Sequence, residues 1–589
     1  MAPSVPATQA SDTDLTSIAE ARALARTARQ AQAALAELSQ NQIDAIVTAM
    51  ADAVTPHAET LARLAVEETG YGVIADKVQK NLFASQRVYE FIRPMRTVGV
   101  VNRIEDKKII EIAEPFGVVA AVVPSTNPTS TAIYKVLISL KARCPIVISP
   151  HPSAARCITR AVEIMAEAAL RAGAPAGSIG WMKTVTLEGT QELMKQRDVA
   201  VILATGGMGL VRAAYSAGKP AYGVGPGNAP CYIERSADVG AAAHDIVLGK
   251  TFDNGLLCSS PNSVVVDAEV AEEARRQFEA RGAKFLSPAE ATQLAAALVT
   301  PQRLPNPKLV GRSAKEIAQQ VGIPVADDVR VLIAPLEGVG RDYPLSIEKL
   351  CPILSWYVVK DWMEGCERCI QILRYGGMGH TMSVHSQNDD VILEFGLKKP
   401  AFRICVNTPT THGSIGLTTG LDPAMTLGCG GVGGNSTSDN ISPRHLLNLK
   451  RVAYGIRPAV ASPGVGAAAT AGGPGMSRPA STMGPQAPVK PVARGISTDE
   501  LRSKVDQFLT SRGYRAVGEG GVGEPASAPP ASVSKTAPVA AVAFVCEDDV
   551  RQAMRAGTTI ALGEKTIVTP AARDLGLAHN VFAPTSWPR

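Results

Sequence analysis

The stretch Gly117-Val-Val-Ala-Ala-Val-Val-Pro-Ser-Thr-Asn-Pro-Thr-Ser-Thr131 joins an apolar run of strand length to a polar turn and then to the beginning of a helical segment. The same alternation continues along the chain, with apolar runs at 146–148, 199–204 and 263–266 and Ala-rich helical segments at 131–142, 154–172 and 209–217. Runs that are apolar on both faces indicate a parallel sheet that is covered by helices on each side. We therefore predict an α/β fold, with a second alternating block from about 252 to 427.

Two elements precede this block. Residues 13–55 form an Ala-rich stretch with the 3.6-residue apolar rhythm of a helix. Two short runs, 98–103 and 108–112, flank the polar pair Glu105-Asp106, and this spacing predicts a β-ribbon.

The composition of the 589 residues, with 46% apolar and 19% charged side chains, excludes wholesale disorder. The excess of 59 basic over 54 acidic side chains is too small to form the basic stripe of a nucleic-acid-binding protein. Residues 1–11 lack the charged and apolar regions of a secretory signal, and no apolar run has the ~18 residues needed to cross a bilayer. We therefore expect a cytoplasmic protein without a nucleic-acid or membrane partner.

Among the ten cysteines, only Cys366 and Cys369 form a tight pair. No second Cys or His pair follows at the spacing of a zinc site, so two buried or half-buried helical thiols are the favoured interpretation. No metal site is expected.

The composition changes near residue 456. Residues 456–495 are rich in Pro, Gly and Ala and contain no acidic side chain, which predicts a linker. Residues 496–514 predict a short amphipathic helix, with a capping box at its start and one apolar face made of Leu501, Val505, Phe508 and Leu509. A second linker, 515–539, precedes a short module at 540–582, to which we assign no chemistry.

The segment Thr251-Phe-Asp-Asn-Gly-Leu-Leu-Cys258-Ser-Ser260 places a cysteine after a Gly-containing turn and before an apolar strand. Such a position could present the Cys258 sulfur at a loop end. A lone cysteine is a weak signal by itself, because structural burial is the more common state of this residue type.

The segments 117–132, 149–152 and 203–207, together with the Cys258 segment, resemble the CoA-acylating aldehyde dehydrogenases in content and in order. The resemblance is to the aldehyde-dehydrogenase half of bifunctional aldehyde–alcohol dehydrogenases and to the propionaldehyde and acetaldehyde dehydrogenases of bacterial microcompartments. It covers roughly residues 15–453. It implies a disordered N-terminus at 1–14, a Rossmann-like cofactor domain at 15–250 with an oligomerisation ribbon at 98–113, a catalytic domain at 251–427, and a return to the cofactor domain at 428–455.

The resemblance also implies roles for three catalytic residues. Cys258 is the expected nucleophile, whose thiolate adds to the aldehyde carbon to give a thiohemiacetal. Asn127 matches the side-chain amide that stabilises the resulting alkoxide together with the backbone N–H at the cysteine, although a helix N-cap is an alternative role for it. His380 resembles a histidine near the cysteine that could relay protons, and a satisfied core histidine is the alternative.

The fate of the thioester left after hydride transfer separates hydrolytic from acylating members of the family. Hydrolytic enzymes carry a Glu that activates water, whereas the corresponding stretch here, Tyr222-Gly-Val-Gly-Pro-Gly-Asn228, has no carboxylate. Without a general base, water competes poorly with a thiol acceptor, so the resemblance points to transfer of the acyl group to coenzyme A.

The cofactor implied by the resemblance is NAD, with NADP left open because Ser149-Pro-His151-Pro152 stands where hydrolytic relatives have a ribose-binding Lys. Glu348 matches a carboxylate that binds the nicotinamide ribose, with a surface helix-end glutamate as the alternative. A Gly pair after Thr205 could place the pyrophosphate near a helix N-terminus, or could be an ordinary tight turn. The expected cofactor-binding residues are Thr126, Ser149, His151, Thr205, Gly206, Gly207, Gly225, Glu348 and Leu350.

We interpret the glycine-rich stretch 427–435 as backbone packing beside the active site.

These expectations describe an enzyme that converts a short aldehyde, CoA and NAD+ into acyl-CoA and NADH, and that acts as a dimer or tetramer. The tail resembles the extensions of microcompartment cargo enzymes, so 496–514 is a candidate encapsulation peptide that binds shell or cargo proteins in the microcompartment lumen. The alternatives are a hydrolytic aldehyde dehydrogenase, a semialdehyde dehydrogenase that uses acyl phosphates, and a non-catalytic scaffold that acts through its tail.

Overall fold

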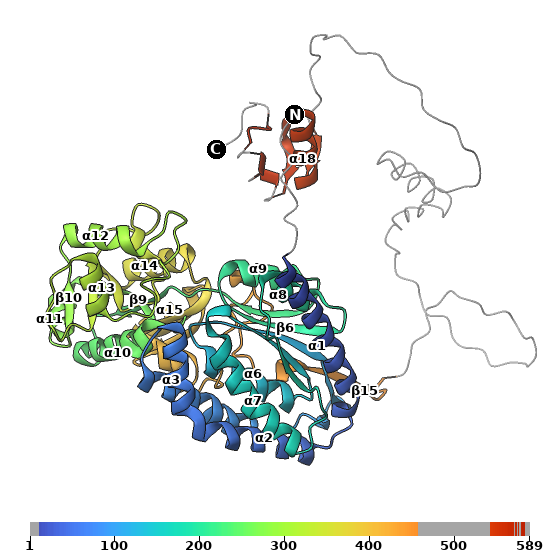
Figure 1. The fold of residues 1–589 in the computed structure, drawn as a ribbon. Coiled ribbons are helices and arrows are strands. Elements are labelled where there is room, and N and C mark those ends of the chain that lie inside the picture. Colours follow the sequence, from blue (N-terminus) through green and yellow to red (C-terminus); the bar gives the residue numbers. More distant parts are fainter. Residues whose placement is uncertain (1–10, 458–541, 570–571, 574, 577–578, 583–589) are drawn as a thin grey trace, which may run out of the picture. The chain divides into compact units, whose positions relative to one another are not determined.

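A computed structural model describes residues 11–457, 542–569, 572–573, 575–576 and 579–582 of the chain. They belong to two compact units that divide after residue 465. The first unit contains two parallel sheets and a three-stranded antiparallel sheet, with helices around the parallel sheets (Figure 1). The expected N-terminal disorder at 1–10, most of the linkers, and the predicted helix at 496–514 lie outside the described residues.

The first parallel sheet has β3 at its centre. Its five strands lie in the order β5 (Ile179–Trp181), β4 (Ile146–Pro150), β3 (Val118–Val123), β6 (Val199–Thr205) and β7 (Ala221–Val224), and every neighbouring pair is parallel. The chain runs outward from β3 to β5 and then restarts on the other side of β3 with β6. Such a reversal of strand order opens a crevice at the carboxyl ends of the strands, which is where open α/β sheets bind their ligands.

The alternation of side chains along β3 explains why the opening apolar run specifies a central strand. Val119, Ala121 and Val123 belong to one core, whereas Val118, Ala120 and Val122 belong to another on the opposite face. The first core contains α2 (Gln40–Val54), α6 (Pro128–Lys141) and α7 (Ala155–Arg171), and the second contains α1 (Asp12–Ala36), α8 (Leu187–Lys195) and α9 (Met208–Tyr215). The prediction of a sheet covered on both faces is confirmed.

Helix α1 begins earlier than expected. Ser11 is its N-cap and forms a capping box with Asp14, so residues 12–14, which fall within the expected disordered N-terminus, are helical. The helix packs on the sheet through Ala21, Ala25 and Ala28, whose small side chains allow a close approach.

The second parallel sheet has seven strands. Their order is β10 (Ala283–Phe285), β11 (Val331–Pro335), β12 (Ile353–Val359), β9 (Pro261–Asp267), β8 (Ala229–Ile233), β13 (Gly379–His385) and β14 (Ala401–Val406). Its helices are α10 (Val239–Thr251), α11 (Ala271–Glu279), α12 (Pro288–Leu298), α13 (Ala314–Val321), α14 (Trp362–Tyr375), α15 (Asp389–Lys398) and α16 (Thr410–Ser414). Because β8 and α10 belong to this sheet, the expected domain boundary at residue 250 is wrong, and the first sheet ends with β7.

The expected ribbon at 98–113 forms the antiparallel pair β1 (Gly99–Ile104) and β2 (Ile109–Pro115). A third strand, β15 (Leu447–Ala453), pairs with β2 in antiparallel register. The chain also returns to the core of the first sheet earlier than residue 428, because Ile415, Ala424 and Leu427 already pack there.

Helices α3 (Ala58–Thr69), α4 (Ile74–Leu82) and α5 (Val88–Ile92) connect the N-terminal helices to the ribbon. No described helix is long and apolar enough to cross a membrane.

The second unit contains a small βαβ arrangement within the predicted module at 540–582. Strands β16 (Val542–Val545) and β17 (Leu562–Val568) pair in parallel, with α18 (Glu547–Ala556) between them in sequence. The start of α18 is capped, since the Asp549 carboxylate accepts a 2.8 Å hydrogen bond from the Cys546 N–H.

Candidate active site

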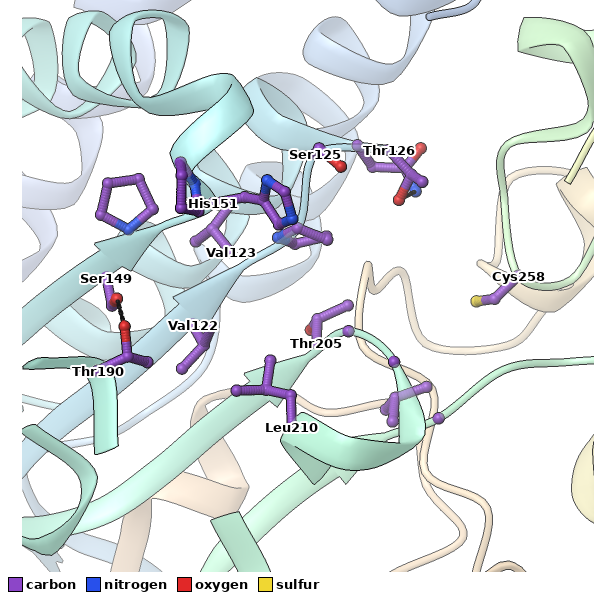
Figure 2. A pocket seen from close by; sticks show the side chains of 18 of the residues that line it. Val122, Val123, Ser125, Thr126, Ser149, His151, Thr190, Thr205, Leu210 and Cys258 are labelled. Carbon is purple, nitrogen blue, oxygen red and sulfur yellow. Dashed lines mark hydrogen bonds between the residues drawn. The ribbon is translucent and has the colours of Figure 1, made fainter. Parts of the chain in front are cut away.

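Cys258 lies half-buried in the loop between α10 and β9. Within this loop Asp253, Asn254 and Gly255 have positive φ values of 49°, 53° and 73°. Left-handed backbone is costly for the first two residues and favours glycine at the third. These three residues turn the chain sharply, as the sequence predicted, and the Cys258 side chain reaches a pocket in the first unit (Figure 2).

The pocket has a volume of about 440 Å³ and lies at the carboxyl ends of β3, β4 and β6, at the reversal of strand order. All of the predicted site residues except His380 line it: Thr126, Asn127, Ser149, His151, Thr205, Gly206, Gly207, Gly225, Cys258, Glu348 and Leu350. The sequence did not identify the hydroxyl and apolar side chains that complete its walls, among them Val122, Thr186, Leu187, Thr190 and Leu210.

One end of the pocket is uncharged and rich in hydroxyl groups. Ser149 Oγ and Thr190 Oγ1 lie 2.8 Å apart there, on the opposite side of Thr205 from Cys258 (Figure 2). Thr205 Oγ1 is buried and has no hydrogen-bond partner among the described residues. Next to it, α9 begins after Gly207, so that N–H groups of its first turn lack partners within the helix. A cleft with free donors at this position of the sheet fits a dinucleotide.

Asn127 occupies the N-cap position of α6, but its side chain makes no capping hydrogen bond. Its Oδ1 accepts a 2.6 Å hydrogen bond from Lys80 Nζ, and its Nδ2 donates to Thr126 Oγ1 at 3.2 Å. The alternative role as a helix cap is therefore not realised by the side chain, and the amide is held at the pocket wall.

Lys80 belongs to a buried charged cluster that sequence reasoning did not find. Its ammonium group and that of Lys77 both donate to Oδ2 of Asp253, and all three side chains are at most 2% exposed. Burial lowers the pKa of Lys80 to about 8, against the opposing effect of Asp253. On α4 the two lysines stand at an ordinary i, i+3 spacing, so no local pattern distinguishes them from surface lysines.

Glu348 is the only carboxylate among the pocket-lining residues, and it faces the turn between β7 and β8. Its Oε1 accepts a 2.9 Å hydrogen bond from the backbone N–H of Gly227. Burial raises the pKa of Glu348 to about 8. The hydrogen bond from the Gly227 N–H and the positive charges of Lys250 and Lys349 oppose this shift only in part. The alternative interpretation, an exposed helix-end glutamate, is wrong, since the side chain lines the pocket.

The turn at Gly227 also touches the cysteine. A Cβ at Gly227 would lie 2.1 Å from the carbonyl oxygen of Cys258 and 3.1 Å from Cγ of His380. Only a residue without a side chain fits between these groups. The stretch 222–228, which contains no carboxylate, is therefore packed directly against the candidate nucleophile.

The Cys258 thiol is not activated by its surroundings in this structure. Burial raises its pKa to about 12, the negative charges of Glu348 and Cys429 act in the same direction, and Arg403 opposes them. The resting side chain is therefore a neutral thiol near neutral pH.

His380 is the second residue of β13 and is buried outside the pocket wall. Its Nδ1 lies 3.0 Å from Thr381 Oγ1, and its Nε2 has no partner among the described residues. Burial, with a smaller contribution from Arg403, lowers the pKa of His380 to about 3, so the imidazole is neutral and does not titrate near pH 6.5 as expected.

The glycine-rich stretch 427–435 packs against the beginning of β13. Arg403 donates to the backbone carbonyls of Gly379, His380 and Gly428. A Cβ at Gly379 would lie 1.8 Å from the carbonyl oxygen of Cys429, so the two backbones are in direct contact. The prediction of backbone packing beside the site is confirmed.

The pair Cys366 and Cys369 lies buried on α14, away from the pocket lining. The Lys399 ammonium group is 2.5 Å from Cys366 Sγ. Within the described part of the chain, no group of three or more His, Cys, Asp or Glu side chains could hold a metal ion.

Two curated relatives each align with nearly three quarters of the chain. The bifunctional aldehyde–alcohol dehydrogenase of Escherichia coli K12 is 41% identical over 444 residues, which are 74% of this chain and 50% of that protein. The succinate-semialdehyde dehydrogenase (acetylating) of Clostridium kluyveri is 36% identical over 427 residues, which are 72% of this chain and 94% of that protein. The chain thus spans about half the length of the aldehyde–alcohol dehydrogenases that it matches.

Solved structures show the same fold. An acetylating aldehyde dehydrogenase from Geobacillus thermoglucosidasius is 48% identical, with a TM-score of 0.75, and the match covers 77% of this chain and 100% of that one. A propionaldehyde dehydrogenase from a fucose-utilisation microcompartment of Clostridium phytofermentans is 28% identical, with a TM-score of 0.66 and coverages of 73% and 96%. A propionaldehyde dehydrogenase from Rhodopseudomonas palustris, solved with bound CoA and an acylated cysteine, is 26% identical, with a TM-score of 0.66 and coverages of 74% and 97%.

The sequence model of the aldehyde dehydrogenase family matches residues 3–420, which include every strand of both parallel sheets and every residue of the pocket. The predicted α/β architecture and the predicted resemblance are therefore confirmed together. The chain belongs to the aldehyde dehydrogenase family, and its relatives include acylating members of that family.

Proposed function

We propose that the chain is a CoA-acylating aldehyde dehydrogenase that converts a short-chain aldehyde, CoA and NAD+ into acyl-CoA and NADH. The observation that carries the proposal is the composition of the pocket around Cys258. A thiol and a side-chain amide lie in one pocket with free polar groups for a dinucleotide, while the neighbouring turn presents the Gly227 backbone instead of a carboxylate. Relatives named as acylating support the same conclusion.

In the proposed reaction Cys258 first loses its proton and its thiolate adds to the aldehyde carbon, which forms a C–S bond and leaves an alkoxide. The Nδ2 group of Asn127 stabilises this negative charge where it develops. The nicotinamide, when bound, supplies the hydride acceptor that turns the adduct into a thioester on Cys258. The thiol of CoA then loses its proton to solvent and attacks the thioester carbon, the bond between this carbon and the Cys258 sulfur breaks, and Cys258 leaves as a thiolate.

Water is a poor competitor for this last step because the pocket lining offers it no free carboxylate as a general base. Glu348 is the only carboxylate in the lining, and it is engaged by the Gly227 N–H and is protonated up to a pKa of about 8. His380, with a pKa of about 3, is a weak base. These features favour an acyl acceptor that brings its own nucleophilic thiol.

NAD is the proposed cofactor, held by the hydroxyl-lined end of the pocket and by the turn at Gly206 and Gly207. The pocket lining contains neither a Lys nor an Arg that would bind the 2′-phosphate of NADP. It also contains no carboxylate at the Ser149 end that would repel this phosphate. We therefore expect a preference for NAD without strict exclusion of NADP.

We further propose that the enzyme is a homo-oligomer that resides in the lumen of a bacterial microcompartment. The three-stranded sheet supports the first part, since β15 exposes the apolar side chains of Leu449 and Val452. The amphipathic pattern at 496–514 and the microcompartment relative support the second. Light scattering tests oligomerisation, and fusing 496–514 to an unrelated protein tests encapsulation: a diffuse fusion in cells that contain shells would contradict it.

The decisive experiment for the activity is NADH formation over a panel of aldehydes, with and without CoA, followed by product identification. We expect NADH and acyl-CoA only when CoA is present, and no turnover by Cys258→Ala. Free carboxylate formed in the absence of CoA would instead show a hydrolytic enzyme, an acyl-phosphate requirement would show the related semialdehyde dehydrogenase reaction, and full cellular function of Cys258→Ala would show a scaffold.

A further inference from the structure

We propose that Lys80 is a positioning residue that fixes the orientation of the Asn127 amide, so that its nitrogen and not its oxygen is available to the reacting alkoxide. The inference rests on the proposed function, in which the amide of Asn127 stabilises that alkoxide.

The orientation follows from the chemistry of the contact. A Lys ammonium group has three hydrogen-bond donors and no acceptor, so it can pair only with the oxygen of the amide. Lys80 Nζ lies 2.6 Å from Asn127 Oδ1, and Nδ2 is thereby directed toward Thr126 Oγ1, 3.2 Å away at the pocket wall. An amide rotated by 180° would present its oxygen to the alkoxide and repel it.

Lys80 is itself held by Asp253. Asp253 accepts hydrogen bonds from Lys80 and Lys77 on Oδ2 and from the Val73 N–H on Oδ1, the last at 2.7 Å. Asp253 lies in the left-handed turn that leads to Cys258. One ammonium group therefore contacts both the loop that carries the nucleophile and the side chain that faces the developing charge.

A purely structural ion pair is the competing explanation, and the chain contains its own comparison. Lys77 lies on the same helix, pairs with the same oxygen of Asp253 and is equally buried, at 2% side-chain exposure. Its other contact is the backbone carbonyl of Thr126 at 3.3 Å, and it does not contact the amide. If only the ion pair matters, the two lysines are equivalent, whereas the positioning role distinguishes them.

The test is a double-mutant cycle in the full chain, measured as CoA-dependent NADH formation from acetaldehyde and propionaldehyde. Asn127→Ala is expected to lower kcat by about 100-fold, as for the loss of one oxyanion donor. Lys80→Met should lower kcat by about 10-fold with little change in KM, and Lys77→Met by less than about 3-fold. In the Asn127→Ala background, Lys80→Met should have an effect below about 2-fold, because the group through which it acts is gone.

Equal losses for Lys80→Met and Lys77→Met, or full additivity of Lys80→Met with Asn127→Ala, would overturn the proposal. Lys80→Arg is the second variant, because it keeps a donor-only cation at the position. It should retain at least a third of the wild-type kcat, and a loss as large as that of Lys80→Met, with normal NAD binding, would also overturn the proposal. Thermal unfolding and NAD binding identify a variant that simply does not fold.

If the proposed activity itself is wrong, the same measurements give a different set of results. A wild-type protein that forms no acyl-CoA, or an Asn127→Ala variant with wild-type kcat, would remove the premise. An intact CoA-dependent activity with a strong Asn127→Ala loss, combined with equivalent lysine variants, would remove only the role of Lys80.

Discussion

The backbone N–H of Gly227 donates a 2.9 Å hydrogen bond to the carboxylate of Glu348. This bond joins the turn after the five-stranded sheet to a segment that precedes β12, and the same turn packs against Cys258. It holds the Glu348 carboxyl group at the pocket wall with one oxygen already hydrogen-bonded, so the geometry of this turn is the first feature to test.

Gly227→Ala should damage the site severely, because the added Cβ would lie 2.1 Å from the Cys258 carbonyl oxygen. Backbone must move to relieve such an overlap, at a cost of about 1–3 kcal/mol, and we expect kcat/KM to fall by about 100-fold or more. Gly396→Ala, on α15 and outside the pocket lining, is the matched control, since its Cβ would meet nothing within 4 Å. Comparable activities of the two variants, by NADH formation, would contradict this account of the turn.

The raised pKa of Cys258 predicts how the cofactor-free enzyme reacts with iodoacetamide. Only the thiolate is alkylated, and below a pKa of about 12 its fraction grows about tenfold with each pH unit. The modification rate at Cys258, followed by peptide mass spectrometry, should therefore rise without a plateau from pH 7 to 9.5. An inflection near pH 6–7 would show an activated thiolate instead, and Cys258→Ala identifies background labelling.

The pKa of about 8 for Glu348 predicts a pH-dependent cost in stability. Between the unfolded value near 4.5 and about 8, the folded protein holds a proton that the unfolded chain has lost, so stability falls as pH rises through this window. Glu348→Gln removes this dependence and can still accept from the Gly227 N–H. Relative to the wild type, its unfolding free energy should be higher at pH 8 than at pH 5 by an amount on the order of 2–4 kcal/mol. Denaturant titrations with the same difference at both pH values would refute the burial of this carboxyl group.

Truncation should separate the two units functionally. A chain that ends at 457 keeps every residue of the pocket and all three strands of the antiparallel sheet, so its kcat/KM should stay within about twofold of the full-length value. A chain that ends at 446 loses β15 and exposes the edge of β2, so it should aggregate or unfold at a lower temperature. A large loss of activity in the chain that ends at 457 would mean that the second unit contributes to the reaction.

The elements that the sequence predicted best are those whose burial is complete. β3 was predicted at Val118–Val123 because both faces of the strand are covered, which leaves an uninterrupted apolar run. The boundary at residue 250 was wrong for a related reason. β8 follows β7 after a short turn and is equally apolar, so nothing local reveals that it joins a different sheet.

The site residues also differ in whether the sequence alone identifies them. Cys258, Asn127 and Glu348 lie in segments with a recognisable family pattern, and the structure brings them into one pocket. The contact between Lys80 and Asp253 joins residues 173 positions apart and has no local signature. The low pKa of His380 was also beyond the sequence, because it arises from burial and from Arg403, which only the folded chain brings near.

The order of strands has a consequence for how such a protein can exchange segments with its homologues during evolution. No strand of the five-stranded sheet comes from beyond β7, and no strand of the seven-stranded sheet comes from before β8. Cys258 and the seven-stranded sheet are therefore encoded by one continuous stretch, from Ala229 to Val406. A single exchange of that stretch between homologous genes would replace the segment that contains Cys258 and leave all five strands of the other parallel sheet in the recipient gene unchanged.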